Sequence, residues 1–149
     1  MPLKKINREP LQFYVPNFEA GNGLPMAGST VRAGFPSPAL DFMEYSIDLN
    51  KELSRNDTCT FYIRVEGNSM VGAGIDDGDI LVADRSLEPE DGCIAICLID
   101  AEFTVKRLKL EIDCLYLVPE NPDYPLLRVT EYNQFLVWGI VTYVIKKIG

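Results

Sequence analysis

Residues 61–85, FYIRVEGNSMVGAGIDDGDILVADR, join two β-type segments through a bend that is rich in glycine. The first segment ends at Val65 and leads into Gly67, Asn68 and Ser69, and further glycines follow in the bend. Glycine lets the backbone turn tightly and lets other backbone approach closely. The stretch therefore predicts a strand, a compact turn that holds one serine hydroxyl at its mouth, and a second strand.

The chain around this stretch is also dominated by short β-type segments. They are rich in Val, Ile, Leu, Phe, Tyr and Thr, and turn pairs such as Asn121-Pro122 separate them. The predicted strands cover residues 58–66, 79–84, 92–99, 102–110, 113–119, 126–130 and 134–146. This pattern indicates a mostly β fold, with a compact and mostly antiparallel body.

Residues 1–37 differ in composition from this body. They contain five prolines, the run Gly21-Asn22-Gly23 and little hydrophobic periodicity, which is typical of an extended and flexible segment. We therefore expect two parts, an N-terminal arm over residues 1–37 and a β-rich domain over residues 38–149. Mostly small residues fill positions 27–34, which suits entry into an enzyme pocket, although an inert linker is the alternative.

Ser37 and Pro38 mark the expected start of the domain. Serine is a favoured N-cap residue and proline is favoured at the first helical position. Apolar residues from Leu40 to Ile47 follow at helical spacing. The sequence therefore predicts one short helix over residues 38–48.

The chain has 149 residues and a formal net charge of −8. Its length fits one domain, and its longest apolar runs, over residues 94–99 and 135–141, are too short to cross a bilayer. The N-terminus does not have the pattern of a signal peptide, so we expect a cytoplasmic protein without a membrane partner. Direct binding to duplex DNA is not expected, because phosphate binding needs a basic surface.

Histidine is absent from the sequence, and this absence removes the Ser-His-Asp and Cys-His types of catalysis. The cysteines form no C-x-x-C pair, so a zinc site would need thiolates from four separate positions: Cys59, Cys93, Cys97 and Cys114. We therefore expect no metal and no cofactor. The thiols are interpreted as small buried side chains in a reducing compartment.

A serine hydroxyl becomes a good nucleophile when a neighbouring base takes its proton. Lys106 is the favoured base for Ser69, because the alternation of EFTVKRLKL places Thr104, Lys106 and Leu108 on one strand face. A lysine pKa near 10.4 leaves only about one amine in 2,500 neutral at pH 7. Burial must therefore lower that pKa to about 7–8, at a cost of roughly 4 kcal/mol in solvation. Taken singly, Ser69 is typical of a turn and Lys106 of a solvated strand.

Several motifs in the same order resemble those of the LexA-like self-cleaving serine peptidases, and of their UmuD-type branch in particular. They are Gly67-x-Ser69-Met70 after a strand, GIDDGDILVAD over residues 74–84 and EFTVKRL over residues 102–108. The segments AGFPSPALDFMEYSIDLN from Ala33 and WGIVTYVIK from Trp138 are similar to the same branch. The resemblance extends from about Arg32 to Lys147, nearly the whole predicted body.

The resemblance implies a fold of the LexA/UmuD C-terminal-domain type and a Ser-Lys dyad. Ser69 is then the nucleophile, Lys106 is the general base and later the general acid, and the backbone N–H groups of Asn68 and Ser69 stabilise the oxyanion. The implied scissile bond joins Ala33 to Gly34 in the chain's own arm.

The resemblance also implies partners. Self-cleavage in UmuD-type proteins is stimulated by RecA filaments on single-stranded DNA, and the trimmed homodimer joins a UmuC-type Y-family polymerase subunit in translesion synthesis. We therefore expect a role in SOS mutagenesis and in DNA repair after DNA damage.

Three alternatives share some of these residues. One is a repressor-type or phage-encoded self-cleaving switch that acts through a transcription partner, and a second is a β scaffold without activity. The third is a signal peptidase, which also uses Ser-Lys chemistry but works from a membrane anchor that the sequence does not predict.

Overall fold

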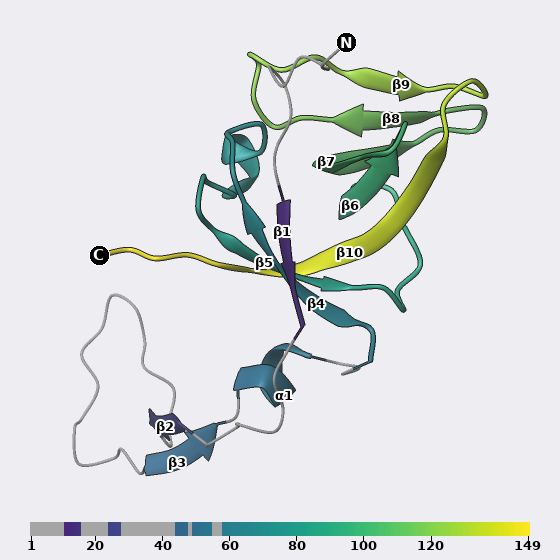
Figure 1. The fold of residues 1–149 in the computed structure, drawn as a ribbon. Coiled ribbons are helices and arrows are strands. Elements are labelled where there is room, and N and C mark those ends of the chain that lie inside the picture. The colour runs from purple at the N-terminus through teal and green to yellow at the C-terminus, as the bar shows by residue number, and fades with distance from the viewer. Residues whose placement is uncertain (1–10, 16–23, 28–43, 48, 55–57) are drawn as a thin grey trace.

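A computed structural model describes residues 11–15, 24–27, 44–47, 49–54 and 58–149. Within these residues, eight strands form one antiparallel sheet in the order β1-β4-β5-β10-β6-β7-β8-β9 (Figure 1). Their bounds are β1 Leu11–Tyr14, β4 Thr60–Val65, β5 Ile80–Asp84, β6 Ile94–Ile99, β7 Glu102–Leu110, β8 Leu115–Val118, β9 Leu127–Val129 and β10 Phe135–Ile145.

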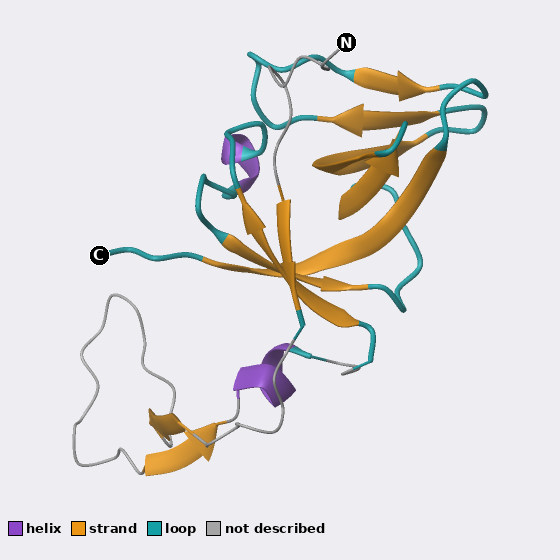
Figure 2. Cartoon of the chain, in the orientation of Figure 1, coloured by secondary structure: helices purple, strands orange, loops and turns teal. Residues whose placement is uncertain are grey.

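Two further strands, one α-helix and a short 3₁₀ turn over Val71–Ala73 complete the regular elements of the described residues. β2 (Leu24–Ala27) pairs antiparallel with β3 (Glu44–Ile47) in a separate sheet, and α1 (Leu49–Leu53) follows. Figure 2 shows that strands and loops make up most of the described chain. No helix in the described ranges is long and apolar enough to cross a membrane.

β10 joins the two halves of the main sheet, because it pairs with β5 and with β6. Its register shifts once against each neighbour, between Val137 and Gly139 and between Val141 and Tyr143. Such bulges bend a strand and increase its twist, and Figure 1 shows β10 as a long curved strand. The curvature brings side chains from both halves of the sheet into one core.

The core contains side chains from strands on both sides of β10. Ile63, Leu81, Ile96 and Val105, from β4, β5, β6 and β7, are fully buried in one cluster. β5 is buried along most of its length because it lies between β4 and β10. A second cluster includes residues of β7 and β8, and its buried members are Ala95, Cys97, Ile99, Leu108, Leu117 and Ile140.

The sequence predicted the strands of the body correctly. All seven strands expected from residue 58 onward are present, and each end lies within two residues of its predicted position. β7 covers the predicted residues 102–110 without a shift. The predicted fold class, a mostly β antiparallel body with a short helix, is confirmed.

The predicted helix over residues 38–48 is wrong in its second half. Glu44–Ile47 form the strand β3, and the helix α1 begins at Leu49 instead. Tyr45 and Ile47 are residue types that favour strands. Pairing with β2 therefore outweighs the helical spacing of the apolar residues.

The N-terminal predictions are only partly covered by the described residues. The cleavage site Ala33–Gly34 lies outside them, as do residues 38–43 of the expected helix. The division of the chain at residue 37 remains a prediction. Leu11–Tyr14, within the expected arm, form the strand β1 at one edge of the main sheet.

We predict that Leu108→Ala destabilises the fold by about 2–5 kcal/mol, because it leaves a cavity in the second cluster. Leu108 is fully buried, whereas Leu110 on the same strand is 40% exposed. Leu110→Ala is therefore the matched control and costs less. Urea unfolding measures both variants, and equal losses of stability would contradict the assigned core.

Candidate active site

Ser69 lies in the turn that follows β4 and is fully buried. The turn begins at Gly67, whose φ of 110° is a conformation that favours glycine, and its N–H donates to Asp77 Oδ1 at 2.9 Å. The next side chain, Met70, is buried in the first core cluster. The backbone carbonyl of Met70 accepts a hydrogen bond from the Ala73 N–H at 3.0 Å, which closes a short 3₁₀ turn. The serine is therefore held by neighbours on both sides.

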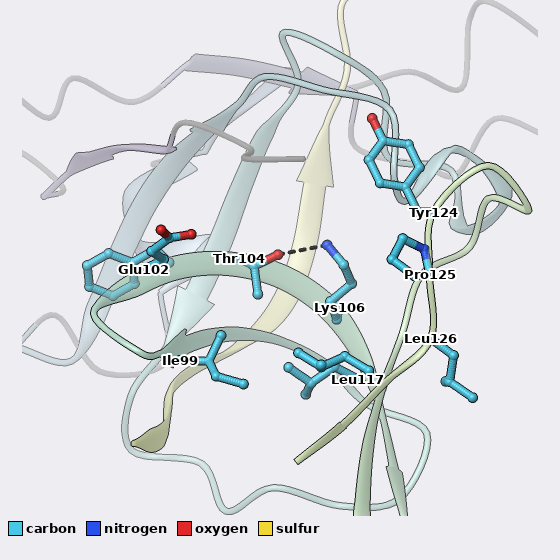
Figure 3. Close-up of a pocket in the computed structure, with 10 residues that line it drawn as sticks. Ile99, Glu102, Thr104, Lys106, Leu117, Tyr124, Pro125 and Leu126 are labelled. Atoms are coloured by element: carbon cyan, nitrogen blue, oxygen red, sulfur yellow. Dashed lines mark hydrogen bonds between the residues drawn. The ribbon is translucent and has the colours of Figure 1, made fainter. Parts of the chain in front are cut away.

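Lys106 reaches the serine from β7. Its Nζ lies 3.0 Å from Ser69 Oγ, 2.7 Å from Thr104 Oγ1 and 3.0 Å from the Val105 carbonyl oxygen. Figure 3 shows Thr104 and Lys106 side by side on the strand, with the amine directed toward the threonine hydroxyl. The strand alternation thus brings together the two residues that the sequence singled out.

These three contacts suit an amine that gains and loses a proton. As an ammonium, Lys106 donates to all three oxygens. After the loss of one proton, two N–H groups remain for Thr104 and Val105, and the lone pair accepts the Ser69 hydroxyl. The half-buried amine is therefore placed to receive the serine proton directly.

The loop between β8 and β9 holds the serine turn in place through hydrogen bonds. The Glu120 N–H donates to the Ser69 carbonyl at 2.8 Å, and the Gly72 N–H donates to the Glu120 carbonyl at 2.8 Å. Asn121 Nδ2 donates to the Asn68 carbonyl, also at 2.8 Å. A Cβ at Gly72 would lie 2.7 Å from the Glu120 carbonyl oxygen, so glycine is required for this contact.

The loop is in turn anchored to β7. Arg107 Nε donates to Glu120 Oε1 at 2.5 Å, and Arg107 also donates to the Gly92 carbonyl at 2.5 Å. Arg107 and Lys106 are adjacent and point to opposite sides of the strand. One strand therefore carries the amine and also supports the loop that fixes the serine.

The same contacts orient one of the predicted oxyanion donors. The Asn68 carbonyl accepts from Asn121, and the planar peptide directs the Ser69 N–H to the opposite side. The orientation of this amide is therefore set by a residue from a distant loop. The second predicted donor, the Asn68 N–H, follows Gly67 in the same turn and remains a prediction.

A cavity of ≈ 240 Å³ opens beside the lysine. Its wall is mostly apolar, with Glu102, Thr104 and Lys106 in a row along β7 (Figure 3). The full lining is Ile99, Glu102, Phe103, Thr104, Lys106, Leu117, Tyr124, Pro125, Leu126 and Leu127. An apolar wall with a few polar groups suits an extended peptide with small or apolar side chains.

Cys97 is the only other potential nucleophile that pairs with this part of β7 in the described sheet, opposite Thr104. Burial raises the pKa of its thiol from 9.0 to about 12, although the Lys106 charge acts in the opposite direction. The thiol is protonated at neutral pH and does not compete with Ser69 as a nucleophile. Because the folded pKa is the higher one, stability falls as pH rises from about 9 to about 12.

Sequence reasoning missed the residues that hold the site in place. Strand alternation places Thr104 on the same face as Lys106, so the sequence pattern is sufficient to predict the contact between these two side chains. Glu120 and Asn121 gave no such indication, because they are distant in sequence and Asn121 is an ordinary turn residue. Their role depends on backbone atoms, which a sequence pattern does not report.

We predict that Gly72→Ala loosens the serine turn. The added methyl group forces the Glu120 carbonyl away, at a cost of about 1–3 kcal/mol in stability, and the Glu120 N–H then exchanges faster with solvent. Val71→Ala, at a 39% exposed position in the same turn, is the control and changes neither. Urea unfolding measures the loss of stability, and amide hydrogen exchange measures the exposure of the Glu120 N–H. Unchanged exchange at Glu120 would contradict the conclusion that Glu120 holds the serine turn.

Comparison with known proteins gives consistent matches. A sequence model described as Peptidase S24-like matches residues 25–142. Protein ImpA of Salmonella typhimurium is 40% identical over 124 residues, which cover 83% of each chain. Protein SamA of the same species is 42% identical over 123 residues, 83% of this chain and 85% of SamA. The LexA repressor of Oleidesulfovibrio alaskensis is 37% identical over 118 residues, 79% of this chain and 56% of the repressor.

Proposed function

Because the chain belongs to the peptidase S24-like family, we propose that it is a self-cleaving serine endopeptidase that cuts its own bond between Ala33 and Gly34. The observation that carries the proposal is the 3.0 Å contact between Lys106 Nζ and the buried Ser69 Oγ. In a chain without histidine, this pair supplies the nucleophile and base that peptide hydrolysis needs.

The reaction has two steps. Neutral Lys106 takes the hydroxyl proton while Ser69 Oγ bonds to the Ala33 carbonyl carbon. The resulting oxyanion accepts hydrogen bonds from the backbone N–H groups of Ser69 and Asn68. The C–N bond then breaks, and Lys106 returns the proton to the Gly34 nitrogen. Water hydrolyses the resulting ester with Lys106 again as base, which frees residues 1–33 and restores Ser69.

The described contacts support the roles of Ser69 and Lys106 in this scheme. Thr104 and Val105 accept hydrogens from the amine and fix its position beside Ser69. The mostly apolar cavity beside it offers space for a small side chain next to the scissile bond. Gly72 and Glu120 keep the serine turn in register with the amine.

We extend the proposal to the cellular role. Resemblance to the UmuD-type branch supports a role in SOS mutagenesis, in which a RecA filament on single-stranded DNA stimulates cleavage. A partner that binds only the state with a docked arm raises the population of that state. The trimmed homodimer then serves a UmuC-type Y-family polymerase subunit in the cytoplasm.

A second candidate function is a self-cleaving switch that acts through a transcription partner. The 37% identity to a LexA repressor over 79% of this chain supports this second candidate. Both functions share the dyad and differ in what the trimmed product binds. Recovery of a polymerase subunit with the trimmed product would favour the first, and recovery of a DNA-binding protein the second.

We predict that the wild-type chain yields a fragment that begins at Gly34. Ser69→Ala abolishes it because the nucleophile is lost, and Lys106→Ala slows it by about 10²–10⁴-fold because the general base is lost. Lys109→Ala is the control, since this lysine lies exposed on the same strand.

Intact mass measures the fragment after incubation at pH 9, and at neutral pH with RecA, ATP and single-stranded DNA. Absence of the fragment in both conditions would leave the protein as a binding module.

We predict that spontaneous cleavage accelerates from pH 7 to pH 9, by up to about tenfold per pH unit, because the neutral fraction of Lys106 rises with pH. The window ends at pH 9, where the Cys97 thiol begins to weaken the fold. Cys97→Ala extends the usable range because it removes this titration. A flat profile in a fully folded chain would rule out a titrating lysine.

A further inference from the structure

β1 closes one edge of the main sheet, where it pairs antiparallel with β4. Leu11 lies opposite Val65 and Phe13 opposite Ile63. The strand precedes residues 25–142, the part that matches the family. It occupies the hydrogen-bonding edge of β4.

The side chains of β1 enter the core of the body. The Phe13 ring lies 4.8 Å from the Phe103 ring and 4.9 Å from the Trp138 ring, measured between centroids. Trp138 also packs on Phe61, at 4.9 Å between centroids. Leu11 packs against the first core cluster. The body thus presents an aromatic slot for Phe13 and a second apolar contact two residues away.

The order of these elements along the chain links β1 to cleavage. The bond between Ala33 and Gly34 lies after β1 and before β4, so cutting it removes the covalent tie between the two strands. In the intact chain the covalent connection raises the effective concentration of β1 at this edge. The released fragment, residues 1–33, pairs with the rest of the described chain through two four-residue strands, β1 on β4 and β2 on β3, which is far less than the roughly 20–30 residues a side of a stable interface. It therefore leaves the edge at micromolar protein concentration.

We propose that the edge of β4 is a strand-docking site, covered by residues 11–14 in the intact chain and opened by self-cleavage. Its partner is an extended segment of another protein, with an apolar residue and an aromatic residue two positions apart. This inference rests on the proposed cleavage at Ala33–Gly34.

The chemistry of the site follows from its present occupant. An open sheet edge offers a row of backbone donors and acceptors that pairs with any extended chain. Selectivity comes from pockets for alternate side chains. The slot between Phe103 and Trp138 selects a planar aromatic ring in the position of Phe13, and the core contact selects an aliphatic residue in the position of Leu11.

The first test uses the full chain with Ser69→Ala, so that no cleavage occurs. Amide hydrogen exchange is followed over β4, with and without Phe13→Ser. We expect Phe13→Ser to accelerate exchange there by at least about tenfold, as expected for the loss of about 1.4 kcal/mol. Val15→Ser is the matched control, since Val15 is 69% exposed beyond the strand, and it leaves exchange unchanged. Equal exchange in all three chains overturns the docking site.

A peptide of residues 9–17, EPLQFYVPN, probes the partner chemistry on the Phe13→Ser chain. We expect a millimolar excess to restore the protection of β4, and the same peptide with serine at position 13 to fail. Equal effects of the two peptides overturn the aromatic requirement.

The second test uses the wild-type chain after self-cleavage. We expect native mass spectrometry at micromolar concentration to show a body without residues 1–33, and β4 exchange to match that of the Phe13→Ser chain. A retained fragment with protected β4 overturns the opening step. A dimer of trimmed chains that protects β4 overturns the assignment of the partner to another protein. Absence of cleavage overturns the proposed function, and the first test still decides the docking site.

Discussion

The contact between Lys106 Nζ and Ser69 Oγ is the constraint on which the site depends. Without histidine, the base for a serine nucleophile is a carboxylate or an amine that can lose its proton beside the hydroxyl, and here the amine of Lys106 lies beside it. Such an amine requires oxygens that accept its hydrogens but carry no charge, and Thr104 and Val105 supply them. It also requires that the serine turn stay within hydrogen-bond distance of a residue on another strand.

β7 meets both requirements because its side chains alternate. Lys106 points toward Ser69, while its neighbour Arg107 binds Glu120, whose backbone holds the serine turn. A displacement of β7 therefore moves the base and the support of the nucleophile together. This shared attachment explains how two residues 37 positions apart keep a distance of 3.0 Å. The fold thus keeps the distance between Lys106 Nζ and Ser69 Oγ constant.

The sequence was sufficient for the strands, because they depend on local alternation and on turn residues, whereas the pairing of Ser69 with Lys106 was expected mainly from the resemblance. It was not sufficient to predict that Glu120 holds the serine turn, because these hydrogen bonds use backbone atoms. β3 was missed because its pairing with β2 is a contact between distant segments, and the same holds for β1 on β4. Patterns within a strand report which face is buried, but they do not name the neighbouring strand. The catalytic roles and the scissile bond rest on the resemblance and remain proposals.

The central place of β10 has a consequence for when the enzyme becomes active. β10 lies between β5 and β6 in the middle of the sheet, yet it leaves the ribosome after every other strand described. In the hydrogen-bonded order of the sheet, β7, which carries Lys106, is linked to β5, next to the serine turn, through β6 and β10. A nascent chain that still lacks β10 has not yet completed the hydrogen-bonded sheet between the strand next to Ser69 and the strand that carries Lys106. We therefore expect the contact between Ser69 and Lys106 to form only after the last strand has been made.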